Sequence, residues 1–192
     1  MDKKALKKTT PIILASSSPR RQKILRENNI SFSVIAPDVE EVVLESAKAT
    51  VLKNSALKAE QVFELNKDKL IITSDTVVSL DDKILGKPKD LAEAASMLTM
   101  LSGKKHEVLT GVSLRSLTLN KDFYESTEVQ FKDLTGNDIE EYFSKCNPLD
   151  KAGAYNIDEY GELIIEKISG SYSNVMGLPI ETLLKTVNFD NF

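Results

Sequence analysis

The chain has 192 residues, with 25 Lys and Arg against 29 Asp and Glu, which gives a net charge of −4 and a pI near 5.2. This length suits one domain, or one domain with two lobes, and a hydrophobic content of 41% excludes disorder as the main state. The acidic charge disfavours a general nucleic-acid binder, and no apolar run reaches the roughly 18–20 residues that cross a bilayer. A single cysteine and a single histidine exclude an internal disulfide and a metal site built from several of either. We therefore expect a cytoplasmic protein without nucleic-acid or membrane partners.

The positive charge is concentrated near the N-terminus. Residues 1–30 carry eight Lys and Arg against two acidic residues, and a positive end on an acidic protein suits a small anion. We expect residues 1–10 to form a basic, flexible tail with solvated lysines, and residues 11–192 to form a single domain.

Hydrophobic periodicity predicts alternating strands and helices. Ser18 and Pro19 are typical of the cap and the first position of a helix, and Phe32, Val34 and Ala36 alternate as on one face of a strand. In the first half of the chain the expected elements are a strand over 12–15, a helix over 18–28, a strand over 31–36, a helix over 45–65 and a strand over 70–72, which 76–78 either continue or pair with.

The second half is predicted to contain a hairpin and three helices. Thr135 with Asp138 resembles a capping box at the start of a helix, and Gly103 can end the helix before it. The expected elements are a turn at 81–82, a short strand at 84–85, a helix over 90–101, antiparallel strands over 108–119 and 124–131 joined near 120–122, a helix after 135, a strand over 163–168 and a helix over 178–187. Interleaved helices and strands, some of them paired as hairpins, indicate an α/β fold with a mixed sheet.

The turn from the first strand into the first helix has an unusual charge. A helix N-terminus has free N–H groups and a partial positive charge, which favours acidic residues, yet this helix begins with Arg20 and Arg21. Serine hydroxyls, N–H groups and two guanidinium groups could converge there on phosphate oxygens. The alternative is an ordinary Ser18 cap with solvent-facing arginines, and the local sequence does not decide between the two.

Acidic residues follow two of the expected strands. Asp75 comes just after the strand at 70–72, where a carboxylate can bind Mg²⁺ or activate a water, or can simply satisfy the backbone of a turn. Asp38, Glu40 and Glu41 follow the second strand, and carboxylates near one another either favour a hard cation or form a solvated face.

Two loops present cations. Gly86 lets the backbone approach closely and Pro88 makes the loop rigid, so that Lys87 between them can neutralise a phosphate. Asp150 and Lys151 precede small residues in a segment that can pack tightly while it presents both charges to a ligand. A loose loop and a surface ion pair are the competing interpretations.

Two common nucleotide-binding motifs are absent. The chain has neither a Gly-x-x-x-x-Gly-Lys-Ser/Thr loop nor a Gly-x-Gly-x-x-Gly turn, which disfavours kinases, common GTPases and dinucleotide dehydrogenases. A serine hydrolase triad would have to use His106, for which we expect a structural role.

Six segments, taken in order, resemble the Maf family of nucleoside triphosphate pyrophosphatases. They read Leu-Ala-Ser-Ser-Ser-Pro-Arg-Arg at 14–21, Ser-Asp-Thr-Val-Val at 74–78, Gly-Lys-Pro at 86–88, Leu-Ser-Gly-Lys-Lys-His at 101–106, Asp-Lys-Ala-Gly-Ala-Tyr at 150–155, and Gly-Ser-Tyr with Val-Met-Gly-Leu-Pro between 170 and 179. The resemblance implies an elongated mixed β-sheet flanked by helices, with two lobes, a cleft between them and often a homodimer. It also implies hydrolysis of a nucleoside triphosphate to monophosphate and pyrophosphate with a divalent cation, Mg²⁺ or Mn²⁺.

The resemblance assigns roles to individual residues by position. Asp75 would be the central acid, as metal ligand, general base for the water, or both, and Glu41 would help to hold metal or substrate. Lys87 would stabilise charge that develops on the phosphates. Substrate contacts are expected from Ser16, Ser18, Arg20, Arg21, Lys58, Asp150, Lys151 and Asp158.

The substrate base is also suggested by the resemblance. The Pro-Arg-Arg form resembles the branch that acts on dTTP and UTP, because the branch that prefers 7-methyl-GTP has a bulky aromatic residue in place of Arg20. After Tyr155 the pyrimidine branch usually reads Gly-Ile-Gln-Gly, whereas this chain has Asn156, Ile157, Asp158 and Glu159. An ionised Asp158 accepts hydrogen bonds but cannot donate, so it could accept from the imide N–H of uracil or thymine or from a guanine edge.

Other functions stay open at this point. A nucleotide-binding regulator of cell division or septum formation would need the cations but no water-activating acid, and a nucleic-acid module would be more basic. We expect a pyrophosphatase acting on dTTP or UTP, with 7-methyl-GTP or another non-canonical nucleotide as the alternative substrate.

Overall fold

A seven-stranded mixed sheet runs through the protein, for which a computed structural model describes residues 10–189; all but residue 10 of the expected basic tail lies outside them. The strands are β1 (Ile12–Leu14), β2 (Ser33–Val34), β3 (Leu70–Leu80), β4 (Lys83–Leu85), β5 (Lys105–Arg115), β6 (Asn120–Phe131) and β7 (Ile165–Ser169). Their order is β2-β1-β3-β5-β6-β7, with β4 paired to β3. Strand β1 is parallel to β2 and β3, and the other pairs are antiparallel. The predicted α/β fold with a mixed sheet is confirmed.

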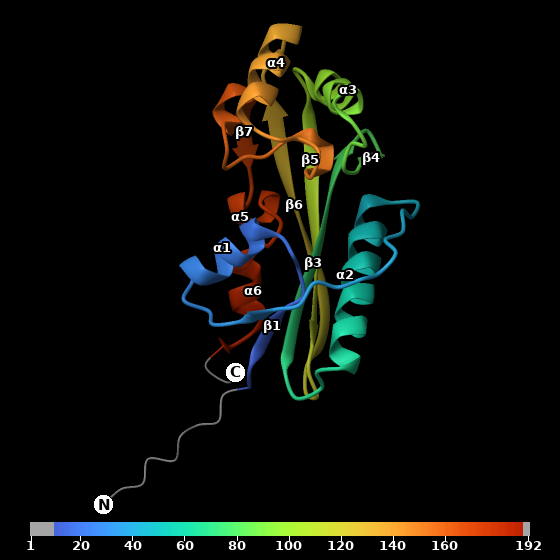
Figure 1. Ribbon diagram of the computed structural model, residues 1–192, viewed down its shortest axis with the longest axis vertical. Coiled ribbons are helices and arrows are strands. Elements are labelled where there is room, and N and C mark those ends of the chain that lie inside the picture. The colour runs from blue at the N-terminus through green and yellow to red at the C-terminus, as the bar shows by residue number, and fades with distance from the viewer. Residues whose placement is uncertain (1–9, 190–192) are drawn as a thin grey trace, which may run out of the picture.

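Helices cover the sheet at several levels (Figure 1). They are α1 (Pro19–Glu27), α2 (Ala47–Glu64), α3 (Leu91–Leu101), α4 (Gly136–Lys145), α5 (Tyr172–Val175) and α6 (Ile180–Thr186), with 3₁₀ turns at Ala152–Ala154 and Gly161–Leu163. Figure 1 shows α2 along one side of the long strands, α1, α5 and α6 on the other side, and α3 and α4 at the far end from both termini. None of the helices within residues 10–189 is long and apolar enough to span a membrane.

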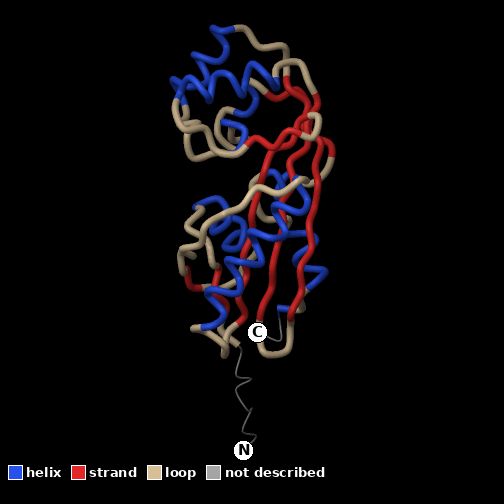
Figure 2. The backbone as a smooth tube through the Cα atoms, turned by 90° about the vertical axis from the view of Figure 1, so that its right-hand side faces the viewer, coloured by secondary structure: helices blue, strands red, loops and turns tan. Residues whose placement is uncertain are grey.

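The three long strands β3, β5 and β6 join two lobes. One lobe contains β1, β2, α1, α2 and α6, and the other contains β4, β7, α3, α4 and both 3₁₀ turns (Figure 1). The side view in Figure 2 shows the two lobes above one another along the long strands. One hydrophobic cluster extends through both lobes, from Leu14 and Leu25 in the first to Leu98 and Tyr142 in the second. The two lobes therefore share a core, and the elongated two-lobed shape expected from the family resemblance is confirmed.

Helix α2 packs unusually close to the sheet at Gly111. This glycine of β5 lies opposite Asp75 of β3, and a Cβ atom added to it would lie 2.5 Å from the backbone oxygen of Val51. The helix begins at a Ser46 cap, whose side chain accepts a hydrogen bond from the backbone N–H of Ala49. Only a residue without a side chain lets α2 reach this position, so Gly111 sets the distance between the helix and Asp75.

The hairpin between β5 and β6 turns earlier than predicted. Arg115 pairs with Asn120, so the turn spans residues 116–119 and not 120–122. The Ser116 hydroxyl closes the turn by accepting hydrogen bonds from the backbone N–H groups of Thr118 and Leu119. The polar run at 120–122 belongs to the strand instead, where the carboxylate of Asp122 forms an ion pair with the guanidinium of Arg115 at 2.6 Å.

Three other expectations about the elements can be compared with the structure. The strand expected over 31–36 is only Ser33–Val34, at an edge of the sheet where Val34 is 42% exposed. Residues 76–78 continue β3 and do not form its partner. The capping box of Thr135 and Asp138 is confirmed at the start of α4.

Candidate active site

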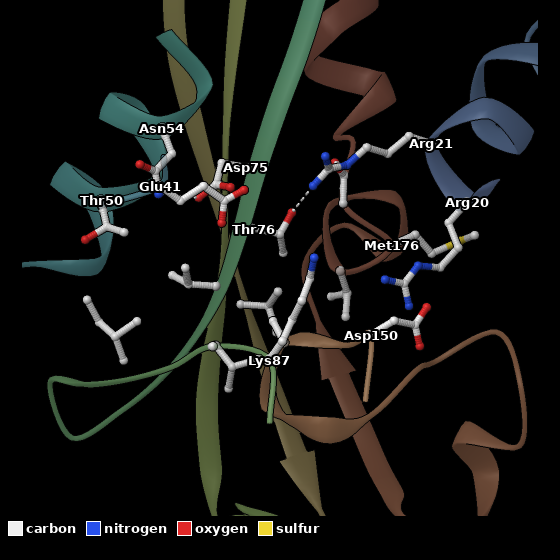
Figure 3. Close-up of a pocket in the computed structure, with 18 of the residues that line it drawn as sticks. Arg20, Arg21, Glu41, Thr50, Asn54, Asp75, Thr76, Lys87, Asp150 and Met176 are labelled. Carbon is white, nitrogen blue, oxygen red and sulfur yellow. Dashed lines mark hydrogen bonds between the residues drawn. The ribbon is translucent and has the colours of Figure 1, made fainter. Parts of the chain in front are cut away.

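A cleft lies between the two lobes, where the loops after β1, β2, β4 and α4 meet (Figure 3). It has two adjoining compartments of about 290 and 530 Å³. The residues that line both compartments are Arg20, Arg21, Glu41, Lys58, Lys87, Asp150 and Asn156. Of the other residues predicted to bind substrate or metal, Asp75 lines the smaller compartment, and Ser16, Ser18 and Lys151 line the larger.

The cleft opens where the sheet pairing beside β3 is interrupted. Strand β1 pairs with β3 only up to Ile72, and β4 pairs with it only from Val78 onward. Asp75 lies between these positions, so it is inside the continuous strand β3 and not at a strand end as the sequence suggested. Side chains alternate here as in any strand: Asp75 contacts α2, whereas Ser74 and Thr76 contact the α1 side.

Lys58 lies between the two acidic residues of the cleft. Its Nζ is 2.6 Å from Glu41 Oε1 and 2.7 Å from Asp75 Oδ1. Lys58 and Asp75 are buried, at 8% and 6% exposure, whereas Glu41 is at the cleft surface. The three groups therefore form one ion cluster at the wall of the cleft, so that Lys58, predicted to contact substrate, lies against both predicted metal ligands.

Asn54 is a site residue that the sequence reasoning missed. Its Nδ2 donates to Asp75 Oδ2 at 3.2 Å and to the backbone oxygen of Val42 at 3.0 Å, and its Oδ1 accepts from the N–H of Val42 at 2.9 Å. Asn54 thus orients the Asp75 carboxylate and fixes the segment that carries Glu41. The available signal was spacing, because Asn54 precedes Lys58 by four residues and so lies on the same face of α2.

The charges of the cluster alter its acid–base properties. Partial burial raises the pKa of Glu41, but the hydrogen bond and charge of Lys58, with smaller effects of Lys87 and Arg21, outweigh it, so the pKa lies below the ordinary value. Burial lowers the pKa of Arg21 to about 10, against the opposing effect of Asp75. At neutral pH Glu41 is therefore ionised and Arg21 remains a cation.

Arg21 joins three separate segments around the interrupted part of the sheet. Its Nε donates to the Gly177 oxygen at 2.9 Å, and its two terminal nitrogens donate to Ser16 Oγ at 3.2 Å, to the Ser74 oxygen at 2.8 Å and to Thr76 Oγ1 at 3.1 Å. The carbonyl of Ser74 lies in the stretch of β3 between the residues paired with β1 and those paired with β4, and Arg21 satisfies it. Most of the donors of Arg21 are thus already used within the protein.

The loop of Ser16, Ser17 and Ser18 before α1 is held by hydrogen bonds to the hydroxyl of Ser16. Ser18 occupies the cap position, but its side chain makes no capping hydrogen bond, and its N–H instead donates to Ser16 Oγ at 3.2 Å. Pro19 holds the first helical position, as predicted, and no acidic residue lies in the first turn. Ser16 also accepts from Arg21, so its hydroxyl fixes the loop against the helix.

Three further cations, Arg20, Lys87 and Lys151, line the cleft. Figure 3 shows Lys87 extending into the cleft and the guanidinium of Arg20 beside the carboxylate of Asp150. Lys151 is buried and its Nζ lies 2.6 Å from Asp150 Oδ1. These groups come from both lobes, so an anion between them would contact both.

The tight approach expected at Gly86 is found at Gly153 instead. A Cβ at Gly86 would meet nothing within 4 Å, whereas Gly153 has φ of +67° and a Cβ there would lie 2.8 Å from Val78. The N–H of Gly153 donates to the Gly86 oxygen at 3.0 Å. This bond connects the loop that carries Lys87 to the segment that carries Asp150 and Lys151.

Asp158 lies apart from the other predicted residues. It lines neither compartment, and its Oδ2 is 3.8 Å from Lys23 Nζ on α1. Its Oδ1 is buried and has no hydrogen-bond partner within residues 10–189. The assignment of Asp158 to the substrate base stays a prediction.

His106 also lies outside the cleft lining. Its Nε2 is 2.8 Å from the hydroxyl of Tyr155, and its ring packs edge-on against Phe131. Burial lowers the pKa of His106 to about 4. A neutral, buried imidazole packed between aromatic rings matches the structural role expected from the sequence.

The two carboxylates fit a divalent cation. Both already contact one positive group, the ammonium of Lys58, so a cation between them is compatible with the local geometry. Mg²⁺ is commonly held by one or two carboxylates together with phosphate oxygens and waters. Among residues 10–189 no group of three or more His, Cys, Asp or Glu side chains could hold a metal alone. The donor set therefore suits a cation that shares its ligands with a bound phosphate chain.

Comparisons with known proteins identify the family of the chain. A family model described as Maf-like protein matches residues 11–188. The chain belongs to the Maf family. It is 45% identical over 182 residues to a dTTP/UTP pyrophosphatase of Bacillus cytotoxicus, covering 93% of this chain and 95% of that protein. It is 48% identical over 171 residues to a protein of the same name from Thermotoga maritima, covering 88% and 84%.

Among solved structures, the Ham1 protein of Staphylococcus aureus aligns with a TM-score of 0.49 and 14% sequence identity, over 92% of this chain and 98% of that one.

Proposed function

We propose that this protein hydrolyses dTTP and UTP at the α–β phosphoanhydride and releases the nucleoside monophosphate and pyrophosphate. The observation that carries the proposal is the contact of Lys58 with both Glu41 and Asp75 in a cleft that Arg20 and Lys87 also line. The family membership and the names of relatives at 45% and 48% identity support the same reaction and the same bases.

Asp75 is the group best placed to accept a proton. Lys58 and Asn54 hold its two oxygens, so the carboxylate is oriented before a nucleotide binds. In the proposed step a water attacks the α-phosphorus, its proton passes to Asp75, and the bond to the bridging oxygen breaks as pyrophosphate leaves. A protein that only binds nucleotides needs no such base, so Asp75 favours an enzyme over a regulator of cell division.

The cations of the cleft would stabilise the leaving group. Charge increases on the pyrophosphate oxygens in the transition state, and groups that are already in position stabilise it without reorganisation. Lys87 and Arg20 line both compartments and can reach phosphates that extend from Asp75. We propose that Mg²⁺ or Mn²⁺, held by Glu41 and Asp75 together with phosphate oxygens, neutralises further charge there.

A nucleotide panel tests the proposal. The protein with Mg²⁺ should release pyrophosphate from dTTP and UTP faster than from CTP, ATP, GTP or 7-methyl-GTP, and no orthophosphate. Asp75→Asn should lower kcat/KM by about 100-fold or more, because it removes the base and a metal ligand. Asp82→Asn, at an exposed turn, is the matched control.

Other results of the nucleotide panel would favour the alternative functions. Tight binding of UTP without pyrophosphate release would favour a regulator, and hydrolysis restricted to 7-methyl-GTP would reassign the base. A homodimer and a cytoplasmic location stay predictions, which light scattering on the purified protein and cell fractionation would check.

A further inference from the structure

Asn156 has a buried side chain that makes no hydrogen bond to any other residue in the described part of the chain, 10–189. The residue is 4% exposed and lines both compartments of the cleft. Within residues 10–189 its amide makes no hydrogen bond, yet neither amide atom is sealed off from solvent. Because so little of the residue is accessible and it lines the cleft, the amide must face the cleft space.

The backbone of Asn156 is held in place by one side chain. Tyr142 of α4 is fully buried, and its hydroxyl accepts a hydrogen bond from the N–H of Asn156 at 2.8 Å and lies 3.3 Å from the Asn156 oxygen, to which it donates. The adjoining residues Tyr155 and Ile157 are buried and line the smaller compartment. The amide is therefore a free polar group on a fixed backbone, next to apolar walls.

The amide of Asn156 carries a donor and an acceptor on two separate atoms of one plane, which neither the charged groups nor the serine hydroxyls of the cleft offer. Arg20 and Lys87 can only donate hydrogen bonds, and the carboxylates can only accept them. The other carboxamide in the cleft lining, Asn54, is already bonded to Val42 and Asp75.

We propose that the Asn156 amide binds the imide edge of the substrate base, accepting from N3–H at Oδ1 and donating from Nδ2 to the adjacent carbonyl oxygen. This inference rests on the proposed pyrimidine triphosphate substrate and adds the group that recognises the base. Uracil and thymine present an N–H beside a carbonyl, and a carboxamide matches that pair with two parallel bonds. Asp158 cannot make this pair, because an ionised carboxylate does not donate and Asp158 lies outside the cleft lining.

Substrates that differ at N3 give the sharpest test. The values of kcat and KM for UTP and for N3-methyl-UTP would be compared in the wild type, Asn156→Ala and the control Asn137→Ala, an exposed asparagine of α4. Loss of the paired bonds should lower kcat/KM for UTP roughly 5- to 100-fold, mainly through KM, and should leave N3-methyl-UTP little changed. The preference of the enzyme for UTP over N3-methyl-UTP should therefore collapse in Asn156→Ala and persist in Asn137→Ala.

A second substitution keeps the shape of the side chain. Asn156→Asp retains acceptors but loses the donor, so it should lower kcat/KM for UTP as Asn156→Ala does, because one carboxylate oxygen can accept from N3–H while the other faces the carbonyl oxygen of the base. The side-chain amide of the wild type can flip about its last rotatable bond and pair with cytosine as well. Comparing CTP with UTP in the wild type is therefore less decisive than the isosteric substitution and the N3-methyl analogue. Melting temperatures would show that each variant is folded.

Two results would overturn the inference while leaving the proposed function intact. One is an equal loss of kcat/KM for UTP and N3-methyl-UTP in Asn156→Ala, and the other is collapse of the preference in Asp158→Ala but not in Asn156→Ala. A wild-type protein that releases no pyrophosphate from UTP or dTTP would instead refute the proposed function. In that case calorimetry with α,β-methylene-UTP still tests Asn156, whose loss should weaken binding of this analogue but not of inorganic triphosphate.

Discussion

Lys58 occupies the position between two carboxylates that a divalent cation would take. Its Nζ lies 2.6 Å from Glu41 Oε1 and 2.7 Å from Asp75 Oδ1. In the free protein the ammonium group already neutralises these oxygens, so a metal gains little by binding until phosphate oxygens add ligands. We predict that Lys58→Met, which keeps the length of the side chain and removes the charge, creates a metal site in the protein without nucleotide.

The size of the effect follows from the geometry of the cluster. Without Lys58, two carboxylate oxygens face each other at roughly 5 Å, where unit charges repel by about 3 kcal/mol at an effective dielectric constant near 20. The Glu41 side chain is 52% exposed, so solvent screens part of this repulsion and about 1–2 kcal/mol remains. For a chain of this size 1 kcal/mol changes Tm by about 2–4 °C, so the variant should melt about 2–8 °C below the wild type.

Mn²⁺ should reverse this loss in the variant. A ligand at 100 times its Kd stabilises the folded state by about 2.7 kcal/mol, which corresponds to a rise in Tm of about 5–10 °C. Differential scanning fluorimetry with and without Mn²⁺ measures the shift, and electron paramagnetic resonance of free Mn²⁺ measures binding directly. Lys53→Met, an exposed lysine of the same helix, is the control and should respond like the wild type, with little change.

Equal Mn²⁺ binding by the wild type and Lys58→Met, without nucleotide, would refute the idea that the ammonium stands in for the metal. Absence of binding to Lys58→Met would refute the pairing of Glu41 with Asp75 as metal ligands. Neither result depends on catalysis, so this test is independent of the substrate.

Three further predictions concern the framework of the site. Arg21→Lys keeps the charge but loses the planar guanidinium that hydrogen-bonds the carbonyls of Gly177 and Ser74. Urea denaturation should therefore show a free energy of unfolding lower by about 1–3 kcal/mol, and kcat/KM should fall in parallel. Unchanged stability would contradict this role of Arg21. Gly111→Ala would place a Cβ against the backbone of α2 and force the helix outward, which should cost about 1–3 kcal/mol of stability and lower kcat in the pyrophosphate assay. Burial lowers the pKa of His106 from 6.5 to about 4. Between these pH values the unfolded chain binds a proton at His106 that the folded protein does not bind. The free energy of unfolding should therefore fall by about 3 kcal/mol as the pH is lowered from 6.5 to 4. Urea denaturation between pH 7 and pH 4 should show this slope in the wild type and a flatter one in His106→Gln.

The elements of the fold could largely be predicted because their signals are local. The Pro19 position, the capping box of Thr135 and the helical spacing between residues 45 and 65 all depend on neighbours within one or two turns. The failures came where a long-range contact decides. Polar residues at 120–122 read as a turn, but Arg115 binds Asp122 and makes that run part of a strand.

The site could be predicted as a set of charges but not as an arrangement. Motif resemblance identified Lys58, Glu41 and Asp75, which come from three segments, and the structure brings them into contact. Asn54 and Asn156 carry no charge; Asn54 stands in none of the six segments, and Asn156 stands where the pyrimidine branch usually has glycine. Their importance depends on which hydrogen bonds each amide already makes, and only the folded chain determines that.

The position of Asp75 inside a continuous strand has a functional consequence. A catalytic group at a strand end depends on a loop that can move, whereas Asp75 is held on both sides by β3, which pairs with β5 along residues 71–79. The cleft reaches Asp75 because neither β1 nor β4 pairs with this part of β3: β1 stops at the level of Ile72, β4 begins at the level of Val78, and Arg21 bonds the carbonyl of Ser74 in between. The protein thereby holds the proposed base at the wall of the cleft, on a strand that is paired with β5 on both sides of it, and a fixed position favours proton transfer from a bound water.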